Sequence, residues 1–236
     1  AAKLHGMGVR VVGWPKTMDN DLSATYFSLG YPTAVEVAAN MLRCSHANAQ
    51  TNSRVHIVTM FGRNTDWVVA GAGRWGLADI VVPCEKEYRF EYIFDKIQKA
   101  ADRNRADYGR RFAVVAVAEG AKIKGLESHL KDDEIDPHGN PKIEPMELAV
   151  VLKGAFKKMN DKCVSIDSVS YLMRDSPPIS IDKNCAYQAG RVCVDMALSG
   201  EFGKAATIGL DNDLGIVGIG RRPLADVARK RYLRPE

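Results

Sequence analysis

The segment Phe112-Ala113-Val114-Val115-Ala116-Val117-Ala118 is almost wholly apolar and contains three β-branched valines. A short run of this kind is typical of a strand that is buried on both faces, as the strands of parallel sheets are. Three further apolar runs bounded by turn residues have the same character, at residues 9–13, 55–60 and 80–83. Together they predict a parallel sheet at the centre of the protein.

Segments with helical spacing lie between these runs. Apolar side chains recur every three or four positions in residues 33–44 and 89–104, and residues 148–158 and 184–198 indicate two more helices. Alternating strands and helices predict an α/β fold whose parallel sheet carries helices on both faces. Residues 131–142 are charged and rich in turn residues, which predicts an exposed loop.

Composition places the chain among ordinary folded proteins. Its 236 residues are 46% hydrophobic and 26% charged, which excludes disordered, collagen-like and coiled-coil classes. The five cysteines are widely spaced and form neither a CxxC motif nor a zinc-ligand pattern. We therefore expect a cytoplasmic protein with reduced thiols and without a membrane partner. No clear linker interrupts the sequence, so we expect one domain over residues 1–236.

The net charge of +4 comes from the C-terminal end. Residues 221–236 hold six Lys or Arg against two Asp or Glu, so the preceding residues are neutral overall. A basic segment of this kind is more typical of a solvated helix face or tail than of a docking patch. A nucleic-acid partner is not expected.

Charged residues gather where the first apolar run ends, in Pro15-Lys16-Thr17-Met18-Asp19-Asn20-Asp21 (PKTMDND). Ligands of open parallel sheets bind beyond the carboxyl ends of strands. Phosphoryl transfer to an alcohol requires a carboxylate that takes the hydroxyl proton, a cation, and a further carboxylate for magnesium. The alternative interpretation is a turn whose charges are solvated.

Four blocks resemble the phosphofructokinase family, and above all its pyrophosphate-type branch. PKTMDND is similar to the family segment PKTIDND, and Asn52-Ser53-Arg54, a strand and Phe61-Gly62-Arg63 resemble the next block. Ala118-Glu119-Gly120 and the Tyr171 to Arg174 segment resemble the third and fourth. The blocks follow the family's order over nearly the whole chain, and they imply a phosphofructokinase-like fold.

The resemblance implies roles in a 6-phosphofructokinase reaction, in which pyrophosphate or ATP phosphorylates the 1-hydroxyl of fructose 6-phosphate. Asp19 corresponds to the catalytic base, and Asp21 to a second catalytic carboxylate that is also the expected Mg²⁺ ligand. Thr17 and Lys16 correspond to residues near the transferring phosphoryl group, and Arg63 to the arginine that stabilises charge on the donor.

The remaining residues correspond to the sugar-phosphate side of the family's site. Glu119 matches a carboxylate that accepts hydrogen bonds from sugar hydroxyls, and Phe61 with Gly62 occupies the place of a Met-Gly pair that packs on the sugar. Arg54, Tyr171 and Arg174 match residues that hold the substrate. Because the counterpart of Arg54 serves a neighbouring subunit's site, we expect a homodimer or homotetramer with shared active sites.

Departures from the family pattern keep a second hypothesis open. Phe61 replaces a methionine, Asp66 replaces a glycine, and Ser165 stands where many members carry a phosphate-binding arginine. A catalytically silent, phosphofructokinase-like subunit that binds sugar phosphate and regulates a partner is the alternative. The family's N-terminal donor-binding segment, with its glycine-rich loop, is expected to be missing from residues 1–236, and GIVGIG at 215–220 follows no obvious strand and does not replace it.

Overall fold

The computed structural model describes residues 1–62, 65–126, 146–158, 163–211 and 216–233. Its contacts divide the chain into two compact units. The terminal unit comprises residues 1–34 and 176–232, and the central unit comprises residues 35–175 and 233–236. The predicted loop at 131–142 and the predicted site residue Arg63 lie outside the described residues.

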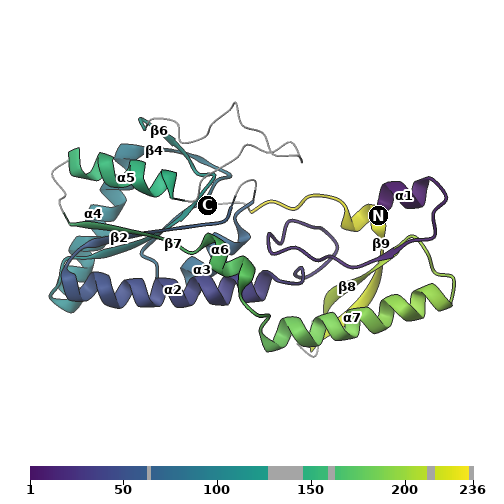
Figure 1. Ribbon diagram of the computed structural model, residues 1–236. Coiled ribbons are helices and arrows are strands. Elements are labelled where there is room, and N and C mark those ends of the chain that lie inside the picture. Colours follow the sequence, from purple (N-terminus) through teal and green to yellow (C-terminus); the bar gives the residue numbers. More distant parts are fainter. Residues whose placement is uncertain (63–64, 127–145, 159–162, 212–215, 234–236) are drawn as a thin grey trace. The chain divides into compact units, whose positions relative to one another are not determined.

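The central unit is built on a four-stranded sheet in the order β3-β5-β2-β7, in which every neighbouring pair is parallel (Figure 1). The strands are β2 (Val55–Met60), β3 (Ile80–Val82), β5 (Ala113–Ala118) and β7 (Val164–Ser168). Every residue of β2 and β5 is buried, because these two strands are central and have both faces covered. The predicted parallel sheet is therefore confirmed for the runs at 55–60, 80–83 and 112–118. The run at 9–13 belongs to the sheet of the other unit, and β7 was not predicted.

Helices cover both faces of this sheet. They are α2 (Tyr31–Asn52), which enters the unit at Val35, α3 (Trp67–Trp75), α4 (Phe90–Tyr108), α5 (Glu147–Lys158) and the short α6 (Ser170–Asp175). Helix α3 connects β2 to β3, whereas α4 connects β3 to β5 and α5 connects β5 to β7, so these two crossovers run across the sheet in the opposite direction to that of α3. Because crossovers between parallel strands are right-handed, α3 lies on one face of the sheet and α4 and α5 lie on the other. Figure 1 shows α2 and α5 on opposite sides of the strands. A small parallel pair, β4 (Glu87–Arg89) with β6 (Lys122–Lys124), completes the unit.

The terminal unit has a mixed sheet in the order β1-β8-β9. Strand β1 (Val12–Gly13) pairs parallel with β8 (Lys204–Asp211), which pairs antiparallel with β9 (Ile216–Pro223). Helix α7 (Ser180–Leu198) packs on this sheet, and the short helices α1 (Ala2–Gly6) and α8 (Leu224–Val227) complete the unit. A buried cluster from the loop after β1, α7 and β8 forms its core: Phe27, Leu29, Cys185, Ala189, Met196, Ala206 and Ile208.

Two expectations are corrected in this unit. The run at residues 9–13 forms a strand only at its last two residues. The segment at 215–220, which was expected to follow no obvious strand, comes after β8, and its residues 216–220 supply most of β9. Glycine at positions 218 and 220 weakened the strand signal there, although Gly218 and Gly220 pair with Gly209 and Thr207 across the hairpin. None of the described helices is both long and apolar enough to cross a membrane.

Candidate functional site

The structure places the sequence-predicted residues in both units. Lys16, Thr17, Asp19 and Asp21 belong to the terminal unit. The sugar-phosphate residues belong to the central unit: Arg54, Phe61, Gly62, Glu119, Tyr171 and Arg174. Each set is described within its own unit.

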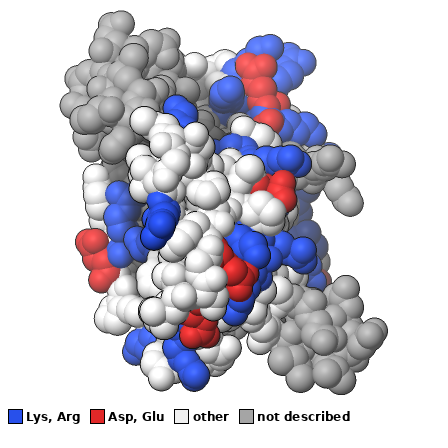
Figure 2. All heavy atoms as spheres, turned by 90° about the vertical axis from the view of Figure 1, so that its right-hand side faces the viewer, with Lys and Arg blue, Asp and Glu red and all other residues white. Residues whose placement is uncertain are grey.

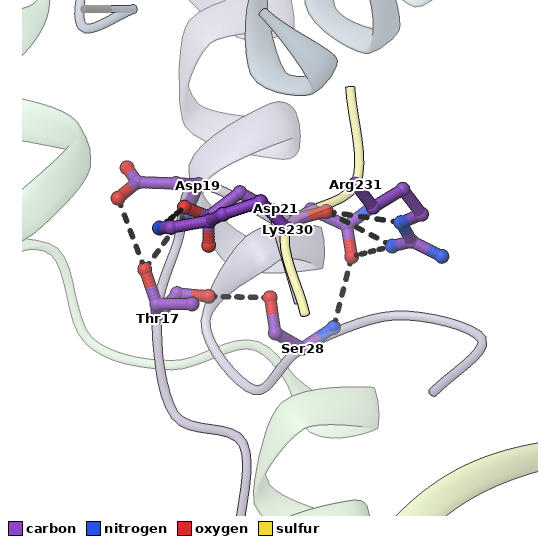
Figure 3. A network of polar contacts seen from close by, with 7 residues as sticks. Thr17, Asp19, Asp21, Ser28, Lys230 and Arg231 are labelled. Atoms are coloured by element: carbon purple, nitrogen blue, oxygen red, sulfur yellow. Dashed lines mark hydrogen bonds and ion pairs between the residues drawn. The ribbon is translucent and has the colours of Figure 1, made fainter. Parts of the chain in front are cut away.

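In the terminal unit, the PKTMDND loop (residues 15–21) follows β1 after one residue, Trp14. Lys16 is exposed and forms an isolated bridge with Leu29, whose N–H donates to the carbonyl of Pro15 at 3.0 Å. The hydroxyl of Thr17 donates to Asp19 Oδ2 at 3.1 Å and accepts from the Asp19 N–H at 3.2 Å. These bonds orient an exposed carboxylate at the surface of the loop, as Figure 3 shows.

Asn20 fixes the turn between the two aspartates. Its φ of 55° lies in the left-handed region, which asparagine tolerates better than most other residues. The Ser28 N–H donates to Asn20 Oδ1 at 3.0 Å, while the Ser28 hydroxyl donates to the Thr17 carbonyl at 2.6 Å. Because Asn20 is buried and held in this way, the neighbouring aspartates occupy different environments.

Asp21 is only 6% exposed, and its Oδ2 forms an ion pair with Lys230 Nζ. A buried carboxylate requires such a partner, because burial removes its hydration. The expected magnesium role of Asp21 fits this arrangement poorly, since the ion would have to displace the ammonium group. Asp19, which is exposed, is the carboxylate that an incoming hydroxyl group can reach.

The basic C-terminal residues contact this loop, which corrects the interpretation of the segment as a solvated face or tail. Residues 229–231 pair with residues 21–23: the Ser23 N–H donates to the Arg229 carbonyl at 2.9 Å and the Arg231 N–H donates to the Asp21 carbonyl at 2.7 Å. The partners are about two hundred positions apart, so no local pattern in the sequence could reveal their contact.

In the central unit, several predicted residues lie at one edge of the parallel sheet. Phe61 and Gly62 follow β2, Glu119 follows β5, and α6 follows β7. Backbone bonds continue the ladder past the strand ends: Glu119 N–H donates to the Met60 carbonyl and Gly120 N–H to the Gly62 carbonyl, both at 2.9 Å. The carboxyl ends of three adjacent strands therefore bring these residues to the edge where ligands of such sheets bind.

Three of these residues form a contact cluster. The guanidinium carbon of Arg174 lies 4.3 Å from the centre of the Phe61 ring, a cation–π contact. The Tyr171 ring meets Phe61 edge to face at 5.6 Å and is 62% exposed. Phe61 thus supports two polar side chains whose donors remain accessible to an anion.

Arg54 is not brought to this edge. It immediately precedes β2, whereas Phe61 immediately follows that strand. A six-residue strand spans about 20 Å at about 3.3 Å per residue. Arg54, which is half-buried, therefore lies at the opposite edge of the sheet.

Asp66 is a buried acidic group beside the predicted cluster. It is fully buried; its Oδ2 accepts from the Cys84 N–H and its own N–H donates to Glu85 Oε1 at 3.0 Å. Burial raises the pKa of Asp66 to about 8, the bond from Cys84 opposes this rise, and Glu85 and Glu119 add to it. The sequence showed Asp66 only as a departure from the family's glycine.

Asp66, Cys84 and Glu85 are the one group among the described residues whose His, Cys, Asp or Glu ligand atoms come within 4.8 Å of one another. The group does not suit magnesium, which prefers oxygen ligands. Burial and Asp66 raise the pKa of the Cys84 thiol far above its usual range, so the thiol stays protonated.

Comparisons with known proteins point to the same family as the four sequence blocks. The family model described as Phosphofructokinase matches residues 1–197. The chain is 29% identical to an ATP-dependent 6-phosphofructokinase from Chloroflexus aurantiacus over 88% of this chain and 54% of that protein. It is 30% identical to a pyrophosphate–fructose 6-phosphate 1-phosphotransferase from Streptomyces coelicolor, over 85% of this chain and 56% of that protein. The chain thus spans about half the length of these curated relatives.

A solved structure confirms the predicted fold. The pyrophosphate-dependent phosphofructokinase from Marinobacter aquaeolei superposes with a TM-score of 0.77 at 23% identity, covering 98% of this chain and 56% of that one. At this identity the similarity concerns the fold alone. The architecture expected from the four sequence blocks is the one observed.

Proposed function

The chain belongs to the phosphofructokinase family, and from that premise we propose that it contributes to the transfer of a phosphoryl group from pyrophosphate or ATP to the 1-hydroxyl of fructose 6-phosphate. The observation that carries the proposal is the exposed Asp19 carboxylate, oriented by Thr17 on a loop that Asn20 fixes. Fructose 1,6-bisphosphate is the product of this reaction.

Asp19 is the proposed general base. As the 1-hydroxyl oxygen attacks the terminal phosphorus, its proton passes to the Asp19 carboxylate and the bond to the departing phosphate or ADP breaks. Lys16, Thr17 and Arg63 are proposed to act on the phosphoryl group, where cations and hydroxyl donors offset the negative charge that moves. Asp21 supports the loop through its ion pair with Lys230.

The central unit supplies the proposed sugar-phosphate residues. A carboxylate such as Glu119 can accept hydrogen bonds from sugar hydroxyls, and the Arg174 guanidinium matches the geometry of a phosphate. The Phe61 ring packs against Arg174 and Tyr171, and Tyr171 offers a hydroxyl from the same cluster. Phe61 and Gly62 are proposed to pack on the sugar. These assignments follow from the resemblance and from the shared sheet edge.

Magnesium belongs to the proposal as the ion that accompanies the donor's phosphates, because Mg²⁺ is commonly held by substrate phosphates with few protein ligands. The ion pair of Asp21 with Lys230 gives no reason to assign that aspartate as its ligand. No step is derived through the metal.

A homodimer or homotetramer is proposed for the complete protein. Arg54 lies at the sheet edge opposite Phe61, so it cannot contact a ligand at that edge of its own sheet. A role in a neighbouring subunit's site accounts for this placement. A cytoplasmic location is proposed as well, since all five cysteines are free thiols, which a reducing compartment maintains.

The second candidate is a catalytically silent subunit that binds sugar phosphate. The buried acid Asp66, where the family has glycine, favours it because it lies beside Gly62 and Glu119. A nucleic-acid binder has less support. Figure 2 shows Lys and Arg interspersed with acidic and uncharged residues on the face that it draws, without one continuous basic patch.

Replacing Asp19 in the full-length protein tests the proposal. Asp19→Asn should lower kcat by about 10²- to 10⁴-fold, because an amide cannot accept the proton, while the affinity for fructose 6-phosphate changes by less than about twofold. A coupled assay with fructose 6-phosphate and each donor in turn measures turnover, and calorimetry measures binding. Asp195→Asn, an exposed position on α7, is the matched control.

Two results would contradict the proposal. Near-normal kcat in Asp19→Asn excludes the assignment of the base. No product from the wild-type protein with either donor, despite measurable sugar-phosphate binding, favours the silent subunit.

A further inference from the structure

We propose that Lys230 and Arg231 are positioning residues, which fix the PKTMDND loop so that Asp19 is held in its working orientation. This inference rests on the proposed function and assigns a role to a segment that no motif includes. Neither residue is proposed to contact substrate. Lys230 acts through Asp21 (Figure 3), and Arg231 acts through Asn20. Asn20 and Asp21 follow Asp19 directly in the chain.

Arg231 holds the backbone on either side of the turn. Its guanidinium donates to the Asn20 carbonyl at 3.0 and 3.2 Å and to Asn20 Oδ1 at 2.5 Å. It also donates to the carbonyls of Thr25 and Tyr26 at 3.0 and 3.3 Å. A planar group with five donors can hold several acceptors at once, which the single ammonium of lysine cannot do.

The hold on Asn20 matters because its backbone is in a sparsely populated conformation. A non-glycine residue at φ 55° persists only where its surroundings determine it. Arg231 and the Ser28 N–H occupy the oxygens of Asn20, and they thereby fix the direction in which the chain leaves Asp19.

Lys230 supplies the counter-charge of Asp21. The carboxylate is buried, and its Oδ2 is paired with the ammonium group. Without that partner, Asp21 would be a buried charge, and the loop would have to move to rehydrate it. The two residues of the segment therefore act on the same loop by different means, one on its backbone and one on its charge.

Leu22 forms an isolated antiparallel bridge with Lys230, and backbone bonds at Ser23 and Arg231 flank it. The C-terminal clamp, as we name residues 229–231, is thus a short strand-like pairing rather than a chance contact of side chains. Burial lowers the pKa of Arg231, and Tyr31 and Asp21 oppose that shift, so the guanidinium remains the charged donor that the clamp needs.

The test separates positioning from plain stability. In the full-length protein, Lys230→Gln should lower kcat by about tenfold to a hundredfold, the range expected for losing a charged hydrogen-bond partner, with KM for fructose 6-phosphate within about twofold. Lys230→Arg, which keeps the charge, should restore kcat to within about threefold of the wild-type value. Arg229→Gln is the control, because its side chain pairs with Asp226 and is 75% exposed.

A second arm follows the loop without any catalysis. Hydrogen exchange of the peptide that covers residues 20–28 should accelerate at least about fivefold in Arg231→Lys and stay unchanged in Arg229→Gln, because Arg231 holds the acceptors of that loop. Using lysine rather than alanine at position 231 keeps the charge and protects folding.

Wild-type kcat in Lys230→Gln, or an equal loss in Lys230→Gln and Lys230→Arg, overturns a positioning role for Lys230. Unchanged exchange in Arg231→Lys overturns the clamp itself. If the wild-type protein phosphorylates fructose 6-phosphate with neither pyrophosphate nor ATP, the proposed function fails instead. The hydrogen-exchange experiment then still decides whether the clamp fixes the loop.

Discussion

The buried carboxyl of Asp66 makes the stability of the central unit depend on pH, and Asp66→Asn should remove that dependence. The side chain is fully buried, and Oδ1 has no hydrogen-bond partner among the described residues. Burial is the main reason that its pKa rises from 3.8 to about 8. The amide of asparagine keeps an oxygen that can accept from the Cys84 N–H, and it has no charge to bury.

The sign follows from proton counting. Between about pH 4 and pH 8 the folded state keeps a proton on Asp66 that the unfolded state has released. The free energy of unfolding therefore falls by about 1.4 kcal/mol for each pH unit across this window. The stabilisation is fully present below pH 4, where both states are protonated, and it is lost once the pH has passed about 8. The whole effect is about 6 kcal/mol.

Urea unfolding at pH 5, 6, 7 and 8 measures the effect. Tryptophan fluorescence is a suitable probe, because Trp67 and Trp75 lie in α3 of the same unit. The unfolding free energy of Asp66→Asn, relative to that of the wild type, should increase by about 1.4 kcal/mol per pH unit. For Asp195→Asn, at an exposed position of the terminal unit, the unfolding free energy should change with pH in parallel with that of the wild type. Parallel profiles for Asp66→Asn would falsify the assignment of a raised pKa to this group.

Two further substitutions test the packing beside each proposed set of residues. Gly62→Ala should lower the free energy of unfolding by about 1 to 3 kcal/mol, because its Cβ would collide with the Asp66 carboxylate and lie 3.1 Å from Ala118 Cβ. Gly154→Ala on α5, with nothing within 4 Å of the new methyl group, is its control, and equal urea midpoints for the two variants would exclude the steric argument. Asp182→Ala should lower the free energy of unfolding by about 2 to 4 kcal/mol, because Asp182 caps the start of α2: it accepts from the N–H groups of Gly30 and Thr33 at 2.8 and 2.9 Å and from the Thr33 hydroxyl. Asp182→Asn, which keeps one acceptor oxygen, should fall between Ala and wild type, and a melting curve unchanged in Asp182→Ala would contradict the capping role.

Local sequence patterns predicted the elements that bury their own apolar faces. The run at residues 112–118 became the central strand β5, and the periodic segment that begins at residue 89 became α4. The hairpin of β8 and β9 was not predicted, because glycines interrupt β9 and its stability comes from pairing with β8. The sequence also did not reveal the division into two units, because one boundary between them falls inside α2 and no linker marks it.

The sequence alone determined the α/β class, the apolar strands typical of a parallel sheet, and the motifs that identify the family, because each is carried by residues close together in the chain. Tertiary structure decided which of the predicted residues meet. It grouped Phe61, Tyr171 and Arg174, sent Arg54 to the opposite sheet edge, and paired Asp21 with Lys230 across about two hundred residues. Contacts between such distant residues depend on how strands and loops pack, and a buried charge finds its partner only when the chain has folded around it.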